Sequence, residues 1–256
     1  MAEETGWSGT AELSLVATAG NAESTSLGFK SALEHAWERS KLILRAEGVR
    51  LESTSDRFAV GTLDRFEVRT PESETTAESY KLEGRYERSL GERLTGHVGL
   101  SWDRNRFAGI DSRSSFQVGV GHIWRDSETF KFRTDYGVTV TRQEDVDGTE
   151  ETFPGLRLAS SLSKTFGKGA TFEHTVVVDE NLDDTEDLRI DMVGSIAVSL
   201  TERLALKASL QLLYDNQPSL ADITLFDRDL MPTGDLVAVE LDELDSILTT
   251  ALVVNF

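Results

Sequence analysis

Charged side chains recur at every second position in several segments of the sequence, with apolar or small residues between them. In the clearest segment, Lys81, Glu83, Arg85 and Glu87 alternate with such residues. A period of two indicates a β-strand with one charged face and one apolar face. On the inside of a closed sheet, charges of both signs can line a hydrated path for ions and small solutes, or pair with one another and close it.

The same parity assigns one face of each predicted strand to the interior of a closed sheet. Positive and negative side chains nearly balance at these positions. They predict either a ladder of ion pairs that narrows the bore or a weakly selective pore. The residues predicted to line the lumen are Lys30, Glu34, Arg45, Glu47, Lys81, Glu83, Arg85, Glu87, Lys131, Arg133, Asp135, Arg189, Asp191 and Lys207.

The chain as a whole is strongly acidic, with a formal net charge of -19 and a pI near 4.6. Because the predicted interior is nearly balanced, the excess negative charge falls largely in the loops, around residues 145–151, 180–186 and 227–243. An acidic mouth concentrates cations and repels anions. Nucleic acid is not an expected partner, since phosphate binding needs a basic face.

One acidic loop, residues 145–151 (DVDGTEE), resembles part of a calcium-binding loop, because hard cations need several oxygen ligands close together. It lacks the full twelve-residue spacing of such a loop. A solvated loop is the favoured interpretation. The absence of cysteine excludes disulfides and thiolate metal sites. We therefore predict no metal site and no cofactor.

The four histidines do not suggest a catalytic group. His35, His122 and His174 have the outward parity near strand ends, and His97 faces inward alone. An acyl hydrolase on the outside of a barrel would need a serine and a histidine together on the apolar face. Serines with outward parity exist, but no pairing with a histidine stands out. The sequence therefore predicts no catalytic residues and no enzyme activity.

Twelve segments with this alternation follow one another from the first strand, near residue 10, to the end of the chain. In the last, residues 244–256 (LDSILTTALVVNF), Leu248, Leu252, Val254 and Phe256 share one parity. A terminal strand that closes on an aromatic residue is typical of a barrel whose last strand pairs with its first. Only four prolines are present, and the long alternating runs are free of them, as strand interiors require.

The connections between these segments alternate in length. The second, fourth, sixth, eighth and tenth are short, and most of the others are longer. A membrane barrel has this arrangement, with tight turns on one side and longer loops on the other. The two longest loops are expected over residues 53–73 and 216–243. Apolar residues within 220–241 predict that this loop covers the mouth as a partial lid or packs against residues 58–66.

These observations predict an all-β fold: a single transmembrane antiparallel up-and-down β-barrel domain of twelve strands over residues 1–256. Short periplasmic turns, longer extracellular loops and a place in the bacterial outer membrane follow from that prediction. The rival is a soluble barrel with an apolar interior, but the apolar parity lacks the bulk to fill so wide a lumen. Residues 1–4 show no signal peptide, so we expect a mature chain from which it has been removed.

Residues 6–14 (GWSGTAELS) followed by residues 18–25 (TAGNAEST) resemble the opening of the salt-induced outer-membrane proteins, a YdiY-like family of β-barrels of unknown function. The strand pattern and terminal Phe256 extend the resemblance loosely over the chain. It implies a Gram-negative outer-membrane location and a link to salt or osmotic stress. It supplies no catalytic residues.

Three hypotheses of function follow. The first is a porin-like channel for small solutes or cations, with ion transport favoured by the acidic mouth. The second is a closed barrel with an ion-paired lumen that acts as a structural or surface-binding protein. The third and weakest is an outer-membrane acyl hydrolase. The expected partners are outer-membrane lipid and lipopolysaccharide, with small solutes or cations in the lumen, and the oligomeric state is left open.

Overall fold

The computed structural model describes most of the chain as β-strand. The described residues are 5–19, 24–53, 58–62, 65–69, 75–106, 109–167, 169–218, 220–227 and 231–256. The strands are β1 (Gly6–Ala19), β2 (Ser24–Ala36), β3 (Ser40–Ser53), β4 (Phe58–Thr62), β5 (Arg65–Arg69), β6 (Thr75–Ser89), β7 (Leu94–Asn105), β8 (Ile110–Asp126), β9 (Phe130–Asp145), β10 (Glu150–Phe166), β11 (Ala170–Asn181), β12 (Leu188–Ser199), β13 (Leu204–Asp215), β14 (Leu220–Phe226), β15 (Pro232–Glu240) and β16 (Leu244–Asn255).

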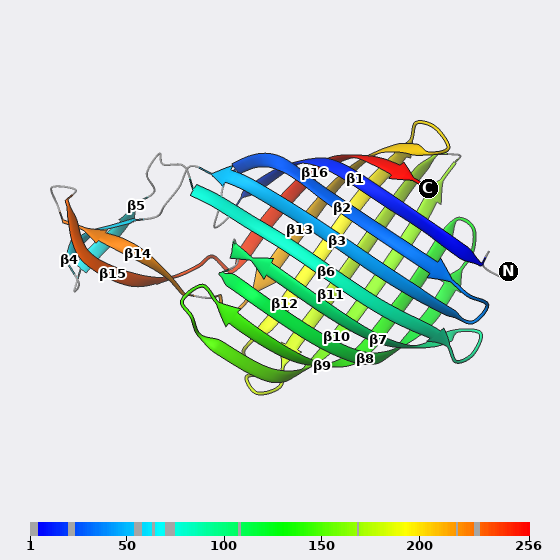
Figure 1. Cartoon of the computed structure of the whole chain (residues 1–256), viewed down its shortest axis with the longest axis horizontal. Helices are drawn as coiled ribbons and strands as arrows, with labels where there is room; N and C mark the ends of the chain where they lie inside the picture. Colours follow the sequence, from blue (N-terminus) through cyan, green and yellow to red (C-terminus); the bar gives the residue numbers. More distant parts are fainter. Residues whose placement is uncertain are drawn as a thin grey trace.

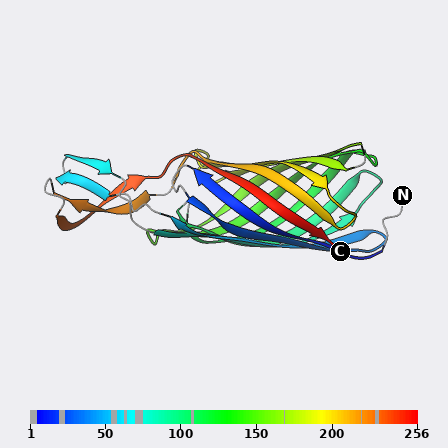
Figure 2. The same cartoon turned by 90° about the horizontal axis from the view of Figure 1, so that it is seen from above.

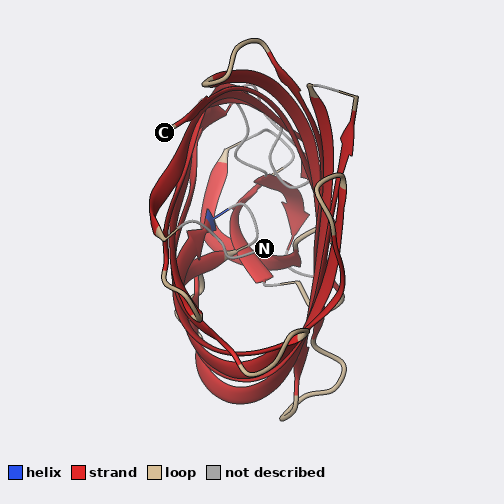
Figure 3. Ribbon diagram, turned by 90° about the vertical axis from the view of Figure 1, so that its right-hand side faces the viewer, coloured by secondary structure: helices blue, strands red, loops and turns tan. Residues whose placement is uncertain are grey.

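Twelve of these strands form a closed antiparallel barrel in the order β1-β16-β13-β12-β11-β10-β9-β8-β7-β6-β3-β2. The last strand pairs with the first, from Thr10 opposite Asn255 to Ala19 opposite Ser246. Both ends of the chain lie at one end of the barrel (Figures 1 and 2). Seen along its axis, the barrel has an oval cross-section (Figure 3). The predicted twelve-stranded membrane barrel, closed by the final segment, is confirmed.

The alternation of connections is confirmed in part: the seventh connection, predicted to be long, is the four-residue turn 146–149 between β9 and β10. The strands meet through short connections at the end that carries the termini, which we call the turn end. The opposite, loop end carries the longer connections, among them residues 182–187 between β11 and β12. In the described part of the chain, no helix has the length and apolar character needed to cross a bilayer.

Apolar side chains cover the outside of the barrel, and polar side chains cover the inside. On β7, Leu100 is 64% exposed on the outer face, whereas His97 and Asp103, on the inner face, are buried. The same alternation runs along β8, where Phe116 and Val118 point outward and Ser115 and Gln117 inward. An outer belt of this kind lies against hydrocarbon, with the polar face turned to the lumen. The predicted orientation of the two parities is therefore correct.

Replacing Leu100 with arginine is expected to destabilise the barrel by roughly 2–4 kcal/mol, the cost of a cation at the bilayer midplane. Urea unfolding in lipid, followed by tryptophan fluorescence, measures this change. Leu90→Arg is the matched control, because Leu90 is also exposed but lies in the turn between β6 and β7. Its expected cost is roughly 0–1 kcal/mol, as near the membrane interface. Equal costs for the two variants would contradict an outward hydrocarbon-facing position for Leu100.

The expectation that residues 53–73 and 216–243 form loops was wrong for a large part of both segments. Within them, β4, β5, β14 and β15 form a second sheet in the order β15-β14-β4-β5. Leu225 and Phe226 of β14 pair in parallel with Ala59 and Val60 of β4. The alternative in which these two segments pack on each other is therefore confirmed.

This small sheet has its own apolar cluster, formed by Ala59, Ile223, Leu225 and Val237, with Val239 against it. Figures 1 and 2 show the sheet beyond the loop end, projecting away from the barrel. The predicted partial lid over the mouth is therefore not what the described residues form. The apolar residues that suggested a lid pack instead within the sheet, which pairs two segments far apart in sequence.

Candidate functional site in the lumen

The barrel encloses an elongated cavity of about 700 Å³, and every one of its twelve strands contributes to the lining. Thr10 and Glu12 line it on the turn side. Asp242 and Glu243, in the segment that joins β15 to β16, line it on the loop side. The cavity therefore extends along much of the barrel.

The structure places all the predicted lumen residues along this cavity except Lys131. The Lys131 side chain is 66% exposed and its Nζ lies 4.0 Å from Asp126, beside the turn between β8 and β9. The prediction was wrong for this residue because parity gives the face of a strand and not the height along the barrel. At the turn end of β9, the inward parity already lies outside the cavity.

Charges of alternating sign form a row across six neighbouring strands. Each member stands opposite the next in the strand register, and the end members are Glu12 on β1 and Arg113 on β8. Two adjacent pairs are in close contact: Lys30 Nζ lies 2.9 Å from Glu47, and Arg113 Nη2 donates to Asp103 Oδ2 at 2.9 Å. This first charge row consists of Glu12, Lys30, Glu47, Lys81, Asp103 and Arg113.

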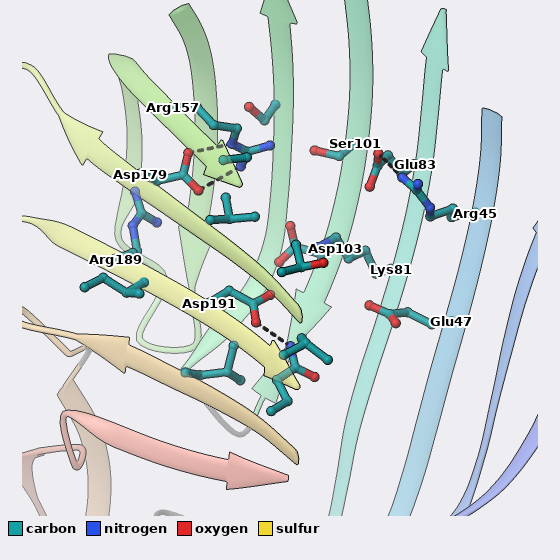
Figure 4. Close-up of a pocket in the computed structure, with 18 of the residues that line it drawn as sticks. Arg45, Glu47, Lys81, Glu83, Ser101, Asp103, Arg157, Asp179, Arg189 and Asp191 are labelled. Carbon is teal, nitrogen blue, oxygen red and sulfur yellow. Dashed lines mark hydrogen bonds and ion pairs between the residues drawn. The ribbon is translucent and has the colours of Figure 1, made fainter. Parts of the chain in front are cut away.

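A second charge row lies on β10 to β13. Arg157, Asp179, Arg189 and Asp215 stand opposite one another in that order. Arg157 binds both oxygens of Asp179, with Nε to Oδ1 at 2.6 Å and Nη2 to Oδ2 at 2.9 Å. Figure 4 shows three members of the first row, Glu47, Lys81 and Asp103, on one part of the wall. It shows three members of the second, Arg157, Asp179 and Arg189, on another. Because each charge has an opposite charge beside it, neither row forms a track of one sign.

A tighter group of charges, the turn-side cluster, joins β6 to β9. Asp135 Oδ1 accepts hydrogen bonds from Arg85 Nη2 at 2.7 Å and from Arg133 Nη2 at 2.6 Å. Glu87 accepts from Arg85 Nε at 2.9 Å and from Arg133 Nη1 at 3.0 Å. Two guanidinium groups and two carboxylates therefore satisfy one another across the two strands that separate β6 from β9.

Two glycines on β8 make room for this cluster. A Cβ at Gly121 would lie 2.6 Å from Asp135 Oδ1 and 2.8 Å from Arg133 Nη2. At Gly119, it would lie 2.7 Å from two atoms of the His97 ring and 2.3 Å from the backbone oxygen of Tyr136. The inward face of β8 is therefore empty at the points where side chains of neighbouring strands lie flat against the wall.

The described lining of the cavity carries ten lysine and arginine side chains and fifteen aspartate and glutamate side chains. The lining of the cavity as a whole therefore has an acidic excess. Four of the carboxylates are at the loop side: Asp215, Asp242, Glu243 and Asp245. Without them, eleven acidic and ten basic side chains line the cavity, which is close to the predicted balance. A negative potential in a confined lumen attracts cations and repels anions.

Several functional charges were missing from the predicted set because the strands extend further than their apolar stretches. Arg113 is absent from the predicted set, yet β8 begins at Ile110 and includes it. Asp179 and Asp215 lie at the loop ends of β11 and β13. Beyond the membrane, the outward residues need not be apolar, so the alternation fades before the strand ends. Extending the inward parity by one or two inward positions beyond the apolar stretches would have included these residues.

The histidines give no support to an acyl hydrolase. On the outer face, His35 packs between Trp7 and Trp37, with ring centroids 4.6 and 4.3 Å away. Its Nδ1, like that of His97, has no hydrogen-bond partner among the described residues. A general base needs contact with its nucleophile and with a residue that orients it. The surroundings of these rings are those of interfacial aromatic packing and of lumen wall.

The acidic segment considered for calcium forms a turn between β9 and β10. The backbone nitrogen of Thr149 donates to Asp147 Oδ1 at 2.8 Å, and the Gly148 nitrogen donates to the Asp145 oxygen at 2.9 Å. Within the described ranges, no group of three or more histidine, cysteine, aspartate or glutamate side chains is close enough to hold a metal ion.

Solved structures with the same fold are outer-membrane proteins. The NanC porin matches with a TM-score of 0.53 at 11% identity, covering 95% of this chain and 98% of that one. The translocator domain of the autotransporter NalP from Neisseria meningitidis matches with a TM-score of 0.49 at 11% identity, covering 99% and 90%. At 11% identity the likeness to the NanC porin shows the fold alone, an outer-membrane-type β-barrel. No curated protein matches the chain.

A family model covers most of the sequence. It matches residues 11–229, and its description is a protein of unknown function, DUF481. The matched region includes the barrel strands β2 to β13 and every member of both charge rows. The resemblance to a barrel family of unknown function, predicted from the opening residues, is thereby confirmed. The chain belongs to the DUF481 family.

Proposed function

We propose that this protein is a porin-like channel of the bacterial outer membrane that passes small solutes or cations. The observation that carries the proposal is the cavity along the barrel, lined by charged and polar side chains from all twelve strands. Apolar side chains that fill the lumen would also stabilise a barrel, so stability alone does not require a cavity lined by charged and polar side chains. NanC, whose solved structure has the same fold, is a porin, which supports the same class.

The direction of selectivity follows from the charge of the lining. Fifteen acidic and ten basic side chains face the cavity among the described residues. Several of the acidic ones surround its loop side, which the proposal places outside the cell. A cation entering there would be attracted, and an anion repelled, most strongly at low ionic strength. The link to salt stress implied by the opening residues is part of this proposal.

Purified protein refolded into planar bilayers is expected to conduct in KCl and, in a KCl gradient, to give a reversal potential of the sign that marks cation preference. Glu243→Gln combined with Asp242→Asn should shift that potential toward zero, because both side chains line the loop side of the cavity. Asp126→Asn is the control, since its side chain is exposed beside a turn. Absence of conductance in protein shown to be folded would refute the channel.

A closed structural or surface-binding barrel is the second candidate. Its supporting observation is the density of ion pairs inside the lumen, where the turn-side cluster ties β6 to β9 and Lys207 lies 2.8 Å from Glu12. Such pairs narrow the bore and stiffen the wall. In this case, folded wild-type protein would not conduct, and a variant with lumen charges removed would.

A further inference from the structure

The middle of the lumen holds one lysine in an unusual electrostatic position. Lys81 on β6 stands opposite Glu47 of β3 on one side and Asp103 of β7 on the other. Each of these carboxylates already has a cation of its own: Lys30 lies 2.9 Å from Glu47, and Arg113 lies 2.9 Å from Asp103. Lys81 is thus an additional cation in a row whose carboxylates are already paired.

Two further carboxylates complete the surroundings of Lys81. Glu83 on β6 is paired with Arg45 at 2.8 Å, and Asp191 on β12 accepts a hydrogen bond from Gln211 Nε2 at 2.8 Å. The Lys81 ammonium interacts electrostatically with all four, namely Glu47, Asp191, Glu83 and Asp103. Figure 4 shows Lys81 beside Asp103 and Glu47, with Asp191 on a strand of another part of the wall. We call these four carboxylates the mid-lumen ring.

Among the described residues, no carboxylate comes within 4.0 Å of the Lys81 ammonium. The ammonium is therefore held by the summed field of the ring and not by one close ion pair. A lysine side chain is suited to such a position, because its compact charge sits on a flexible four-carbon stem. The same flexibility allows it to move aside without breaking a short contact.

The ring also indicates which cations could replace the ammonium. Its members are too far apart to hold a metal ion directly, since the described residues contain no such group. Divalent ions that need several carboxylates in contact are therefore poor candidates. A hydrated monovalent cation, or an organic ammonium similar to the end of a lysine side chain, matches the field that the ring provides.

We propose that the mid-lumen ring is a binding site for monovalent and organic ammonium cations, and that Lys81 occupies it with its own ammonium until a passing cation displaces it. The proposal rests on the proposed channel function for its role in transport. The binding site itself depends only on the ring.

The first test is electrical. Lys81→Met should raise the permeability of potassium and methylammonium relative to chloride by roughly two- to fivefold, the effect of one unit charge at 4–10 Å in water. Lys81→Arg should behave like the wild type, because the charge is kept. Lys207→Met is the matched control, since it removes another lumen lysine, paired with Glu12 at 2.8 Å, away from the ring. Equal shifts for Lys81→Met and Lys207→Met would overturn the proposal.

The second test does not depend on conductance. Crystals of Lys81→Met soaked in rubidium chloride should show anomalous density among Glu47, Asp103 and Asp191, and wild-type crystals should not. Lys81→Gln serves as the second variant if Lys81→Met does not fold. No density in folded variant crystals would overturn the site even if the wild type conducts. Density in the variant with a non-conducting wild type would support the site and refute the proposed channel.

Discussion

Replacing Gly119 with alanine is expected to destabilise the barrel substantially. The new Cβ would lie 2.3 Å from the backbone oxygen of Tyr136 and 2.7 Å from the His97 ring. The oxygen belongs to the neighbouring strand β9 and cannot rotate away, so the β8–β9 pairing must shift. Overpacking of this kind costs roughly 1–3 kcal/mol, and occasionally more. The midpoint of urea unfolding, measured by tryptophan fluorescence, reports the loss.

Gly84→Ala is the control for this change. Gly84 lies on β6, and the nearest atom to its added Cβ is the flexible Leu44 Cδ2 at 3.6 Å, an ordinary contact distance. Its unfolding midpoint should stay close to that of the wild type. If the two variants unfold at the same denaturant concentration, the wall can accept a side chain at Gly119. The packing of the His97 ring and of β9 against β8 would then not require a glycine there.

Replacing Asp135 with asparagine is expected to have a larger effect, because it removes the charge that two arginines share. Arg85 and Arg133 both donate to Asp135 Oδ1, at 2.7 and 2.6 Å. Without this charge, Glu87 is the one carboxylate among the described residues that remains in contact with the two guanidinium groups. Breaking a buried ion pair by removing one partner costs roughly 3–5 kcal/mol, and water in the lumen should place this variant near the lower end.

Thermal unfolding, read from the shift in gel mobility of unboiled samples, measures the change. Asp126→Asn is the matched control, because its carboxylate is 4.0 Å from Lys131 and both side chains are largely exposed. Adding Arg133→Met to Asp135→Asn should restore part of the lost stability, since the excess positive charge is then reduced. A double variant less stable than Asp135→Asn would show that the cluster is not held together by charge balance.

Gly119 and Asp135 belong to the same part of the wall. The turn-side cluster reaches from β6 to β9 only because β8 presents no side chain at Gly119 and Gly121. The empty face lets long side chains lie along the wall. The middle of the lumen is then available to the two charge rows and to Lys81. The turn-side cluster and a cavity lined by the two charge rows are therefore compatible in one barrel.

The sequence by itself determined the barrel strands and their faces. Alternation along Lys81, Glu83 and Arg85 identifies both the strand and the side of it that faces the lumen, because successive side chains of a strand point to opposite faces. The regular succession of short and longer connections then determined that the strands run up and down in order. The alternation is local, because each segment of the sequence shows by itself whether it is a strand and which of its faces is polar.

Only the tertiary structure decided which charges meet. Lys30 and Glu47 pair because the register of β2 and β3 sets them opposite each other, whereas Arg85 reaches Asp135 across two intervening strands. The small sheet likewise joins β4 to β14, segments far apart in the chain. Register and strand height depend on the tilt and stagger of the closed barrel, to which all twelve strands contribute. A period of two within one strand contains no information about that stagger, so it could not place Lys81 among four carboxylates from different strands.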